Sequence, residues 1–353
     1  MDTTGTLDEA LERLHTSGPE REGWLSNHAP MAVEALVRNG QQRTVHRWLD
    51  RYRHKLEDMP APGTPVTADT WQEALGDPAR LADWTLFFAR QLAEQPWRDV
   101  LGAWWPRLLP GMPGAATHTV IRTGHAVRTL LDDEAGGDLR PDGSDPGPRL
   151  TELAHALGYW AARHAPLPDV RRLPAAGSAG AGLDAVPLID DRSGGIRDRL
   201  ARLSALPERP GPPDPDDTAA EDGLRALVRA AAHRYATHAH GEPVMLVHAV
   251  TGPNAVLRIL PALPRDQWAA SLDVAWAVGA AVTAVYSPAE GAPPVRAGST
   301  SPEEVFERAA AHGDEHAIKL ADTVLDVASW DPDGDRLELA AALRGVELIE
   351  PVF

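Results

Sequence analysis

The sequence predicts an all-α protein, a single large helical domain with long loops rich in Pro, Gly and Ala and little or no strand. Apolar residues recur at spacings of three and four along most of the chain, which is typical of amphipathic helices. Glycines and prolines separate these periodic segments, as they do at helix ends. The alternation of apolar and polar residues that marks strands is scarce. The chain has 353 residues, 43% of them hydrophobic, and can therefore bury a sizeable core.

Helical periodicity predicts the elements in order along the chain. In the first half the periodic segments are residues 6–14, 28–40, 44–57, 81–95, 97–109, 117–133 and 150–165. The breakers between them are Gly40, residues 60–65, Gly76 and residues 108–114. In the second half the periodic segments are residues 222–239, 244–263, 267–287, 302–330 and 335–345. The best strand candidate is the C-terminal stretch LRGVELIEPVF, residues 343–353.

Two stretches have the composition of loops. Residues 132–148 are acidic and rich in Gly and Pro, and residues 166–220 are rich in Pro, Ala, Gly and Asp with weak helical patches. A connection as long as the second is functional, a flexible cover or a domain boundary. We favour one helical domain over residues 1–353 with two flexible excursions, because the informative motifs lie on both sides of the longer one.

Composition excludes several classes of site and partner. The absence of cysteine rules out disulfides, thiolate metal sites and iron–sulfur clusters. The net charge of −17 makes nucleic acid an unfavourable partner. The first residues have neither a basic nor an apolar signal region, and we find no uninterrupted apolar run of membrane-spanning length. We therefore expect a cytoplasmic protein that does not enter a membrane.

Lysine is rare in this chain. Of 34 basic residues only Lys55 and Lys319 are lysine, so the remaining 32 are arginine. Lys55 lies in the polar stretch RYRHKLED, whereas Lys319 lies between apolar residues in HAIKLADTVLDV. Burial lowers the pKa of a lysine, and a neutral amine can react with carbon dioxide to give a carbamate that binds a metal. The alternative is an ion pair with a neighbouring carboxylate at position 314, 315 or 322.

Five of the fourteen histidines stand out. Nine others lie among polar residues or at expected helix ends: His15, His46, His54, His155, His164, His233, His238, His240 and His312. The remaining five lie in apolar surroundings: His28, His118, His125, His248 and His316. A single one of these could be a hydrogen-bonded core residue. Because each buried imidazole needs partners for two nitrogens, several together favour a shared metal ion.

Other motifs carry little information. The GSAGAG stretch at 177–182 resembles a dinucleotide-binding loop but lacks a preceding strand. There is no nucleophile elbow, phosphate-binding loop or zinc-protease motif. The tryptophans are most simply core residues. Four of them are candidate walls for a flat aromatic ligand: Trp104, Trp105, Trp160 and Trp276.

Six segments, in this order and between about residues 20 and 335, resemble the questin-oxidase-like family. They are NHAPMAVEAL, WWPRLLPG, HTVIRTGHAV, GYWAARH, HAVTGPNAVLRILPAL and HAIKLADTVLD. The resemblance implies an oxygenase of aromatic polyketide pathways, described as Baeyer–Villiger-type or as a non-heme iron dioxygenase acting on anthraquinone-like rings. Its substrate would be a small aromatic molecule and its co-substrate molecular oxygen.

The resemblance also implies a ligand set. Four histidines and a carboxylated lysine would hold Fe(II) or another divalent metal, and they fall on His28, His118, His248, His316 and Lys319. The spacing His-x-x-Lys is the most specific element of this pattern.

Two further residues are implied beside the metal. We expect His125 and Arg122 to be catalytic, with His125 either contacting a metal ligand or facing the substrate. Fungal members of the family tend to have an aromatic residue in place of His125 and a histidine in place of Arg122. The alternatives are a metal-free Baeyer–Villiger-type oxidase, either dependent on NADPH or independent of cofactors, and a non-catalytic helical binding protein. We expect a monomer or a homodimer.

Overall fold

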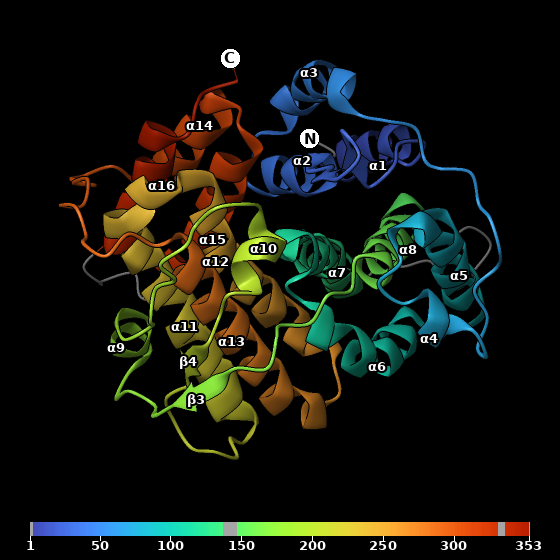
Figure 1. The fold of residues 1–353 in the computed structure, drawn as a ribbon. Helices are drawn as coiled ribbons and strands as arrows, with labels where there is room; N and C mark the ends of the chain where they lie inside the picture. The colour runs from blue at the N-terminus through green and yellow to red at the C-terminus, as the bar shows by residue number, and fades with distance from the viewer. Residues whose placement is uncertain (1–2, 137–146, 331–335, 353) are drawn as a thin grey trace. The chain divides into compact units, whose positions relative to one another are not determined.

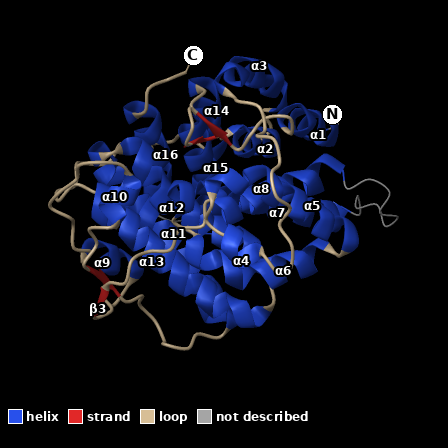
Figure 2. Cartoon of the chain, turned by 45° about the vertical axis from the view of Figure 1, so that its right-hand side comes forward, coloured by secondary structure: helices blue, strands red, loops and turns tan. Residues whose placement is uncertain are grey.

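The computed structural model describes residues 3–136, 147–330 and 336–352. In this part of the chain the prediction of an all-α fold is confirmed (Figures 1 and 2). Sixteen α-helices make up most of the described residues, and the four strands there are two or three residues long. By its internal contacts the chain divides into two compact units. Unit 1 is Met1–Pro166 with Arg258–Pro264, and unit 2 is Leu167–Leu257 with Arg265–Phe353.

Unit 1 is built from the first eight helices and one short hairpin. The helices are α1 (Thr3–Leu14), α2 (Ala29–Arg38), α3 (Gln42–Tyr52), α4 (Trp71–Ala74), α5 (Leu81–Glu94), α6 (Trp97–Leu108), α7 (His118–Gly136) and α8 (Gly147–Ala162). Strands β1 (Glu20–Arg21) and β2 (Leu25–Ser26) pair antiparallel. The loop expected at 132–148 is helical at both ends, in α7 and α8, and its residues 137–146 lie outside the described part of the chain.

Helix α8 packs between α5 and α7 in unit 1 (Figure 1). Gly158 allows its closest approach to α5, because a Cβ there would lie 2.7 Å from the backbone nitrogen of Thr85. Helix α2 in turn packs against α1, α3 and α7. These contacts bring the start of α2 and the start of α7, where two of the predicted metal ligands lie, into one unit.

Unit 2 contains the other eight helices and one two-stranded parallel sheet. The helices are α9 (Ala179–Asp184), α10 (Ile196–Leu200), α11 (Asp217–His238), α12 (Pro243–Ile259), α13 (Trp268–Tyr286), α14 (Pro302–His312), α15 (Glu315–Trp330) and α16 (Leu337–Leu348). The strands are β3 (Arg171–Leu173) and β4 (Ala205–Pro207). The stretch expected to be an excursion, residues 166–220, therefore supplies two strands and two short helices. The last two residues of α12 are counted with unit 1.

Two local predictions in unit 2 need correction. The C-terminal stretch predicted as a strand is helical as far as Leu348, in α16. The apolar residues of α16 pack on α11 and α15, and Gly345 supports this packing because a Cβ there would lie 2.9 Å from the Leu320 side chain. The segment 302–330, expected to be one helix, is two helices. Gly313 ends α14 with a left-handed backbone (φ 82°), a conformation that glycine adopts without strain.

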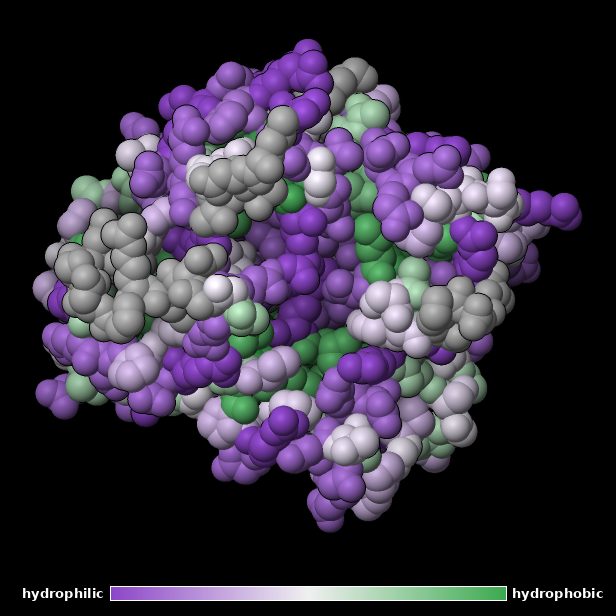
Figure 3. Space-filling view, turned by 180° about the vertical axis from the view of Figure 1, so that it is seen from behind, coloured by the Kyte–Doolittle hydropathy of each residue, from purple (hydrophilic) through white to green (hydrophobic). Residues whose placement is uncertain are grey.

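Two helices are long and apolar enough to cross a membrane by length and hydropathy alone. They span Pro243–Ala262 and Arg265–Tyr286, and 72% of each apolar window is buried within the protein. Core helices pass the same test, so this is weak evidence. The expectation of no membrane-spanning helix, drawn from the lack of a continuous apolar run, stays a prediction. Hydrophilic residues cover much of the face seen in Figure 3.

We predict that Gly158→Ala destabilises unit 1. The added methyl group has no space against the α5 backbone, so the two helices must separate. We expect the free energy of unfolding to fall by about 1–3 kcal/mol in urea denaturation. Gly63→Ala is the matched control, since a Cβ there meets only the Asp83 carboxylate at an ordinary 3.6 Å. Equal stability of the Gly158→Ala protein and the wild type would contradict this account of the packing.

Candidate functional site

Unit 1 brings two predicted metal ligands together. His28 immediately precedes α2 and His118 is the first residue of α7. Their Nε2 atoms lie 2.6 Å apart, and their ring centroids 4.4 Å apart in an edge-on arrangement. Both side chains are buried. Two histidines that are 90 positions apart in the sequence therefore place their Nε2 atoms next to each other.

Hydrogen bonds at the other ring nitrogens constrain the protonation of this pair. The Nδ1 atom of His118 lies 2.6 Å from the Ala115 carbonyl oxygen, to which it must donate, so its Nε2 has a lone pair. The hydroxyl of Tyr52 accepts from the His28 backbone N–H (3.1 Å) and lies 3.4 Å from the His28 Nδ1 atom. If that hydroxyl donates to Nδ1, His28 Nε2–H donates to His118. If it accepts from Nδ1, both Nε2 lone pairs face each other, which is the arrangement of two metal ligands.

A strained turn sets the position of His118. Ala115, Ala116 and Thr117 all have left-handed backbones, with φ of 48°, 54° and 66°. Each such residue other than glycine costs about 1–2 kcal/mol. The turn is also tightly packed, because a Cβ at Gly114 would lie 2.0 Å from the Arg163 carbonyl oxygen. Strain of this kind persists only where the surrounding structure holds it, and it is concentrated at functional sites.

Unit 2 brings the other predicted ligands together. His248 on α12 and His316 on α15 have ring centroids 5.4 Å apart, again edge-on. The Nδ1 atom of His248 lies 3.1 Å from the Met245 carbonyl oxygen, which fixes the proton on Nδ1. Asp314 caps α15 by accepting from the backbone N–H of His316 at 2.8 Å. The cap therefore holds the first turn of α15, from which His316 and Lys319 both extend.

Lys319, on α15 of unit 2, is buried. Its side chain is 1% exposed, and among the described residues its Nζ atom has no hydrogen-bond partner. Burial lowers the pKa of this amine to about 7, although the charges of Glu315 and Asp314 act to raise it. Burial also lowers the pKa of His248 well below its usual range, and the charges of Lys319 and His316 lower it further. Near pH 7, His248 is therefore neutral and a large share of the Lys319 amine is unprotonated.

In the described part of unit 2, one group of side chains could hold a metal ion by its geometry. Asp314, Glu315 and His316 each offer a ligand atom, and these atoms all lie within 4.8 Å of one another. The sequence suggested only one role for the two carboxylates, as ion-pair partners of Lys319. Their position directly before the HAIK motif was the signal that they could also be metal ligands.

His125 and Arg122, the predicted catalytic residues, take part in two buried charge clusters of unit 1. The Nδ1 atom of His125 lies 2.6 Å from Oε2 of Glu34. Arg122 forms a two-pronged ion pair with Glu152, at 2.5 and 2.8 Å. Glu34 was not predicted as a site residue, although it is a lone carboxylate in the apolar stretch APMAVEALV, which was the available signal.

The four candidate tryptophans do not form one wall. Trp105 and Trp160 pack edge to face, with ring centroids 5.4 Å apart. Trp104 instead belongs to a cluster with Trp84 and other aromatic residues of α5. In unit 2, Trp276 donates to the Pro207 carbonyl oxygen at 2.8 Å. All four are buried, so packing accounts for them, and their contact with substrate stays a prediction.

Comparisons with known proteins give no family for this chain. No protein-family model matches the sequence, and no curated protein matches it.

We predict that Ala115→Gly stabilises the protein. Glycine removes the left-handed strain and keeps the carbonyl group that accepts from His118. After the entropy lost to the more flexible unfolded chain, we expect a gain of roughly 0.5–1 kcal/mol in urea denaturation. Ala126→Gly, in the right-handed part of α7, is the control and should destabilise by about 1 kcal/mol. A loss of stability in Ala115→Gly would show that the turn is not strained.

We predict a second stability effect, dependent on pH, at Glu152. Burial by itself would raise the pKa of this carboxyl, but the charge and hydrogen bonds of Arg122 lower it to about 2. The unfolded chain takes up this proton near pH 4.5, so the stabilisation is present above that pH and is lost as the pH falls toward 2. The stability difference between wild type and Glu152→Gln should therefore shrink below pH 5, by up to about 3 kcal/mol. A difference that stays constant from pH 6 to 3 in thermal denaturation would contradict this.

Proposed function

We propose that this chain is an oxidoreductase that uses a non-heme metal ion, Fe(II), to oxygenate a small aromatic substrate of the anthraquinone type. The proposed ligands are His28, His118, His248 and His316, with Lys319 in its carboxylated form. The observation that carries the proposal is the Lys319 amine, which is fully buried and of lowered pKa on the helix that bears His316. The likeness of six segments to the questin-oxidase-like family supports the reaction class.

The chemistry of Lys319 fits such a ligand. An unprotonated amine adds to carbon dioxide, forming an N–C bond and releasing one proton, and the product is an anionic carbamate. That anion offers the oxygen donors and negative charge that iron prefers over a neutral amine. A metal ion bound to that anion would give this buried side chain the partner that a bare Lys319 lacks among the described residues.

The imidazoles fit the same role. His118 and His248 each donate Nδ1–H to a backbone carbonyl, which fixes the tautomer in which Nε2 is the basic nitrogen, the form of imidazole that binds a metal. Neutral histidines are the form that binds cations, and burial keeps His248 neutral. A bound iron would supply the electrons for reaction with molecular oxygen, and the buried surroundings would exclude water from it.

A non-catalytic binding protein is the second candidate. The observation in its favour is the His28–His118 contact, which one ordinary hydrogen bond between the two Nε2 atoms also explains. In that case His28 and His118 are only hydrogen-bond partners of each other, and no ion is needed. A metal-free oxidase is the third candidate, and measurements with and without iron separate it from the first.

We predict that Lys319→Arg abolishes tight metal binding. Arginine cannot form the carbamate, so the site loses its anionic ligand. We expect one iron per chain in the wild type by metal analysis of protein purified without chelator, and at least a ten-fold loss of affinity in Lys319→Arg. Protein prepared in ¹³C-labelled carbon dioxide should show a carbamate NMR signal that the variant lacks. Oxygen uptake with a hydroxylated anthraquinone should require iron.

Lys55→Arg is the matched control, because it makes the same change at the only other lysine and keeps a cation over the Tyr52 ring. His118→Ala and His316→Ala test whether both units serve the ion, since each should then lower its affinity. Full metal content and activity in Lys319→Arg would exclude the carbamate. A wild-type protein that binds no metal would exclude the iron oxygenase and leave the binding protein and the metal-free oxidase.

A further inference from the structure

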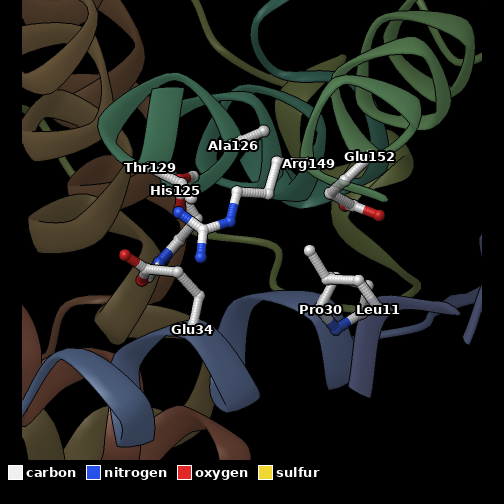
Figure 4. A pocket seen from close by; sticks show the side chains of 8 residues that line it. All are labelled: Leu11, Pro30, Glu34, His125, Ala126, Thr129, Arg149 and Glu152. Atoms are coloured by element: carbon white, nitrogen blue, oxygen red, sulfur yellow. The ribbon is translucent and has the colours of Figure 1, made fainter. Parts of the chain in front are cut away.

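A carboxylate, an imidazole and a guanidinium form a buried cluster in unit 1. Glu34 on α2 accepts from Nδ1 of His125 on α7 at 2.6 Å. Arg128, one turn further along α7, donates through Nε to Oε1 of Glu34 at 3.0 Å and through its terminal nitrogen to Oε2. All three side chains are less than 9% exposed. Figure 4 shows Glu34 and His125 extending toward each other from the two helices.

The contact with Glu34 fixes which nitrogen of His125 carries the proton. An ionised carboxylate can only accept, so Nδ1 must be the donor and Nε2 the basic nitrogen. The guanidinium of Arg128 donates to both oxygens of Glu34, a contact typical of a carboxylate. Burial lowers the pKa of His125, although the Glu34 charge and hydrogen bond act to raise it, so the imidazole is neutral at pH 7. Among the described residues, the Nε2 atom has no hydrogen-bond partner.

A small pocket adjoins this cluster. It is lined by His125, Glu34, Thr129 and Glu152 among others, all within unit 1 (Figure 4). Its free space is about that of one water molecule. A hydroxyl group fits a space of that size, whereas an aromatic ring does not. A metal ion is disfavoured at Glu34, because Arg128 already binds both of its oxygens.

We propose that Glu34 is a positioning residue that holds His125 as a general base, and that Nε2 of His125 accepts the proton of a phenolic hydroxyl. In this step the substrate O–H bond breaks, an Nε2–H bond forms, and the electron pair stays on oxygen as phenolate. The imidazolium that results is stabilised by the Glu34 carboxylate. The phenolate is more electron-rich than the phenol and is therefore more readily oxidised. This inference rests on the proposed function and adds to it the residues that take the proton from the substrate.

The first test reads the tautomer directly and needs no activity. In ¹⁵N-labelled, metal-free protein, NMR long-range correlations should show His125 protonated on Nδ1, the signal being assigned by its absence in His125→Phe. In Glu34→Gln the side-chain NH₂ can donate to Nδ1, so a population protonated on Nε2 should appear. Glu34→Asp should keep the wild-type tautomer. Protonation of wild-type His125 on Nε2 would overturn the inference, whatever the protein does.

The second test uses oxygen uptake with a hydroxylated anthraquinone by the iron-loaded protein. We expect kcat to fall about 10²-fold or more in His125→Gln and by at least ten-fold in Glu34→Gln, with iron content unchanged. Glu34→Asp should recover part of the rate. Glu338→Gln, at a buried carboxylate of unit 2 near His233, controls for a general loss of stability.

The outcomes separate the inference from the proposed function. An active wild type whose kcat is unchanged in Glu34→Gln and His125→Gln would overturn the general base and leave the oxygenase standing. An inactive wild type with His125 protonated on Nδ1, and shifted to Nε2 in Glu34→Gln, would keep the positioning role and reject the oxygenase.

Discussion

The burial of the Lys319 amine is the constraint that most limits what this structure can do. A buried ammonium without a partner is costly, and the protein can lower that cost only by deprotonation or by binding a counter-charge. The side chain lies one turn from the start of α15, where Glu315 and Asp314 contribute negative charge. Their effect does not cancel that of burial. The result is an amine that is partly unprotonated near neutral pH in a protein that otherwise uses arginine for its positive charge.

In three of the buried histidines, the hydrogen-bond partner of Nδ1 determines which ring nitrogen carries the proton. His118 and His248 both have Nδ1 fixed by a carbonyl oxygen three residues earlier in the chain. His125 has the same nitrogen fixed by a carboxylate from another helix. Three imidazoles thus present Nε2 as the reactive atom. A carbonyl partner leaves the ring uncharged, which suits metal binding, whereas a carboxylate partner stabilises the protonated ring, which suits proton transfer.

Much of the fold was predictable from the sequence, because the 3–4 spacing of apolar residues sets the buried face of each long helix. The errors were local. Gly345 looked like the end of a helix, but α16 continues because the glycine lets it approach Leu320 on α15. Gly313 looked like part of a helix, yet its left-handed backbone separates α14 from α15. Whether a glycine continues a helix or ends it cannot be predicted from that residue alone, because it depends on how the neighbouring helices pack.

The candidate site was predictable in part. The apolar surroundings of the histidines predicted their burial, and the structure pairs His28 with His118 and His248 with His316. The partner of His125 was not predictable, because Glu34 lies 91 positions away. The strained turn before His118 was also hidden, since Ala and Thr give no signal for a left-handed backbone. Ion pairs between helices and strain imposed by packing arise only in three dimensions.

The scarcity of lysine has a practical consequence for studying this molecule. Only two side chains, Lys55 and Lys319, carry an amine, and their environments are opposite, one partly exposed and one in the core. Reagents that acylate amines would modify Lys55 rapidly and would reach Lys319 only when the protein around it opens. The rate at which Lys319 is modified therefore measures how often its surroundings open transiently.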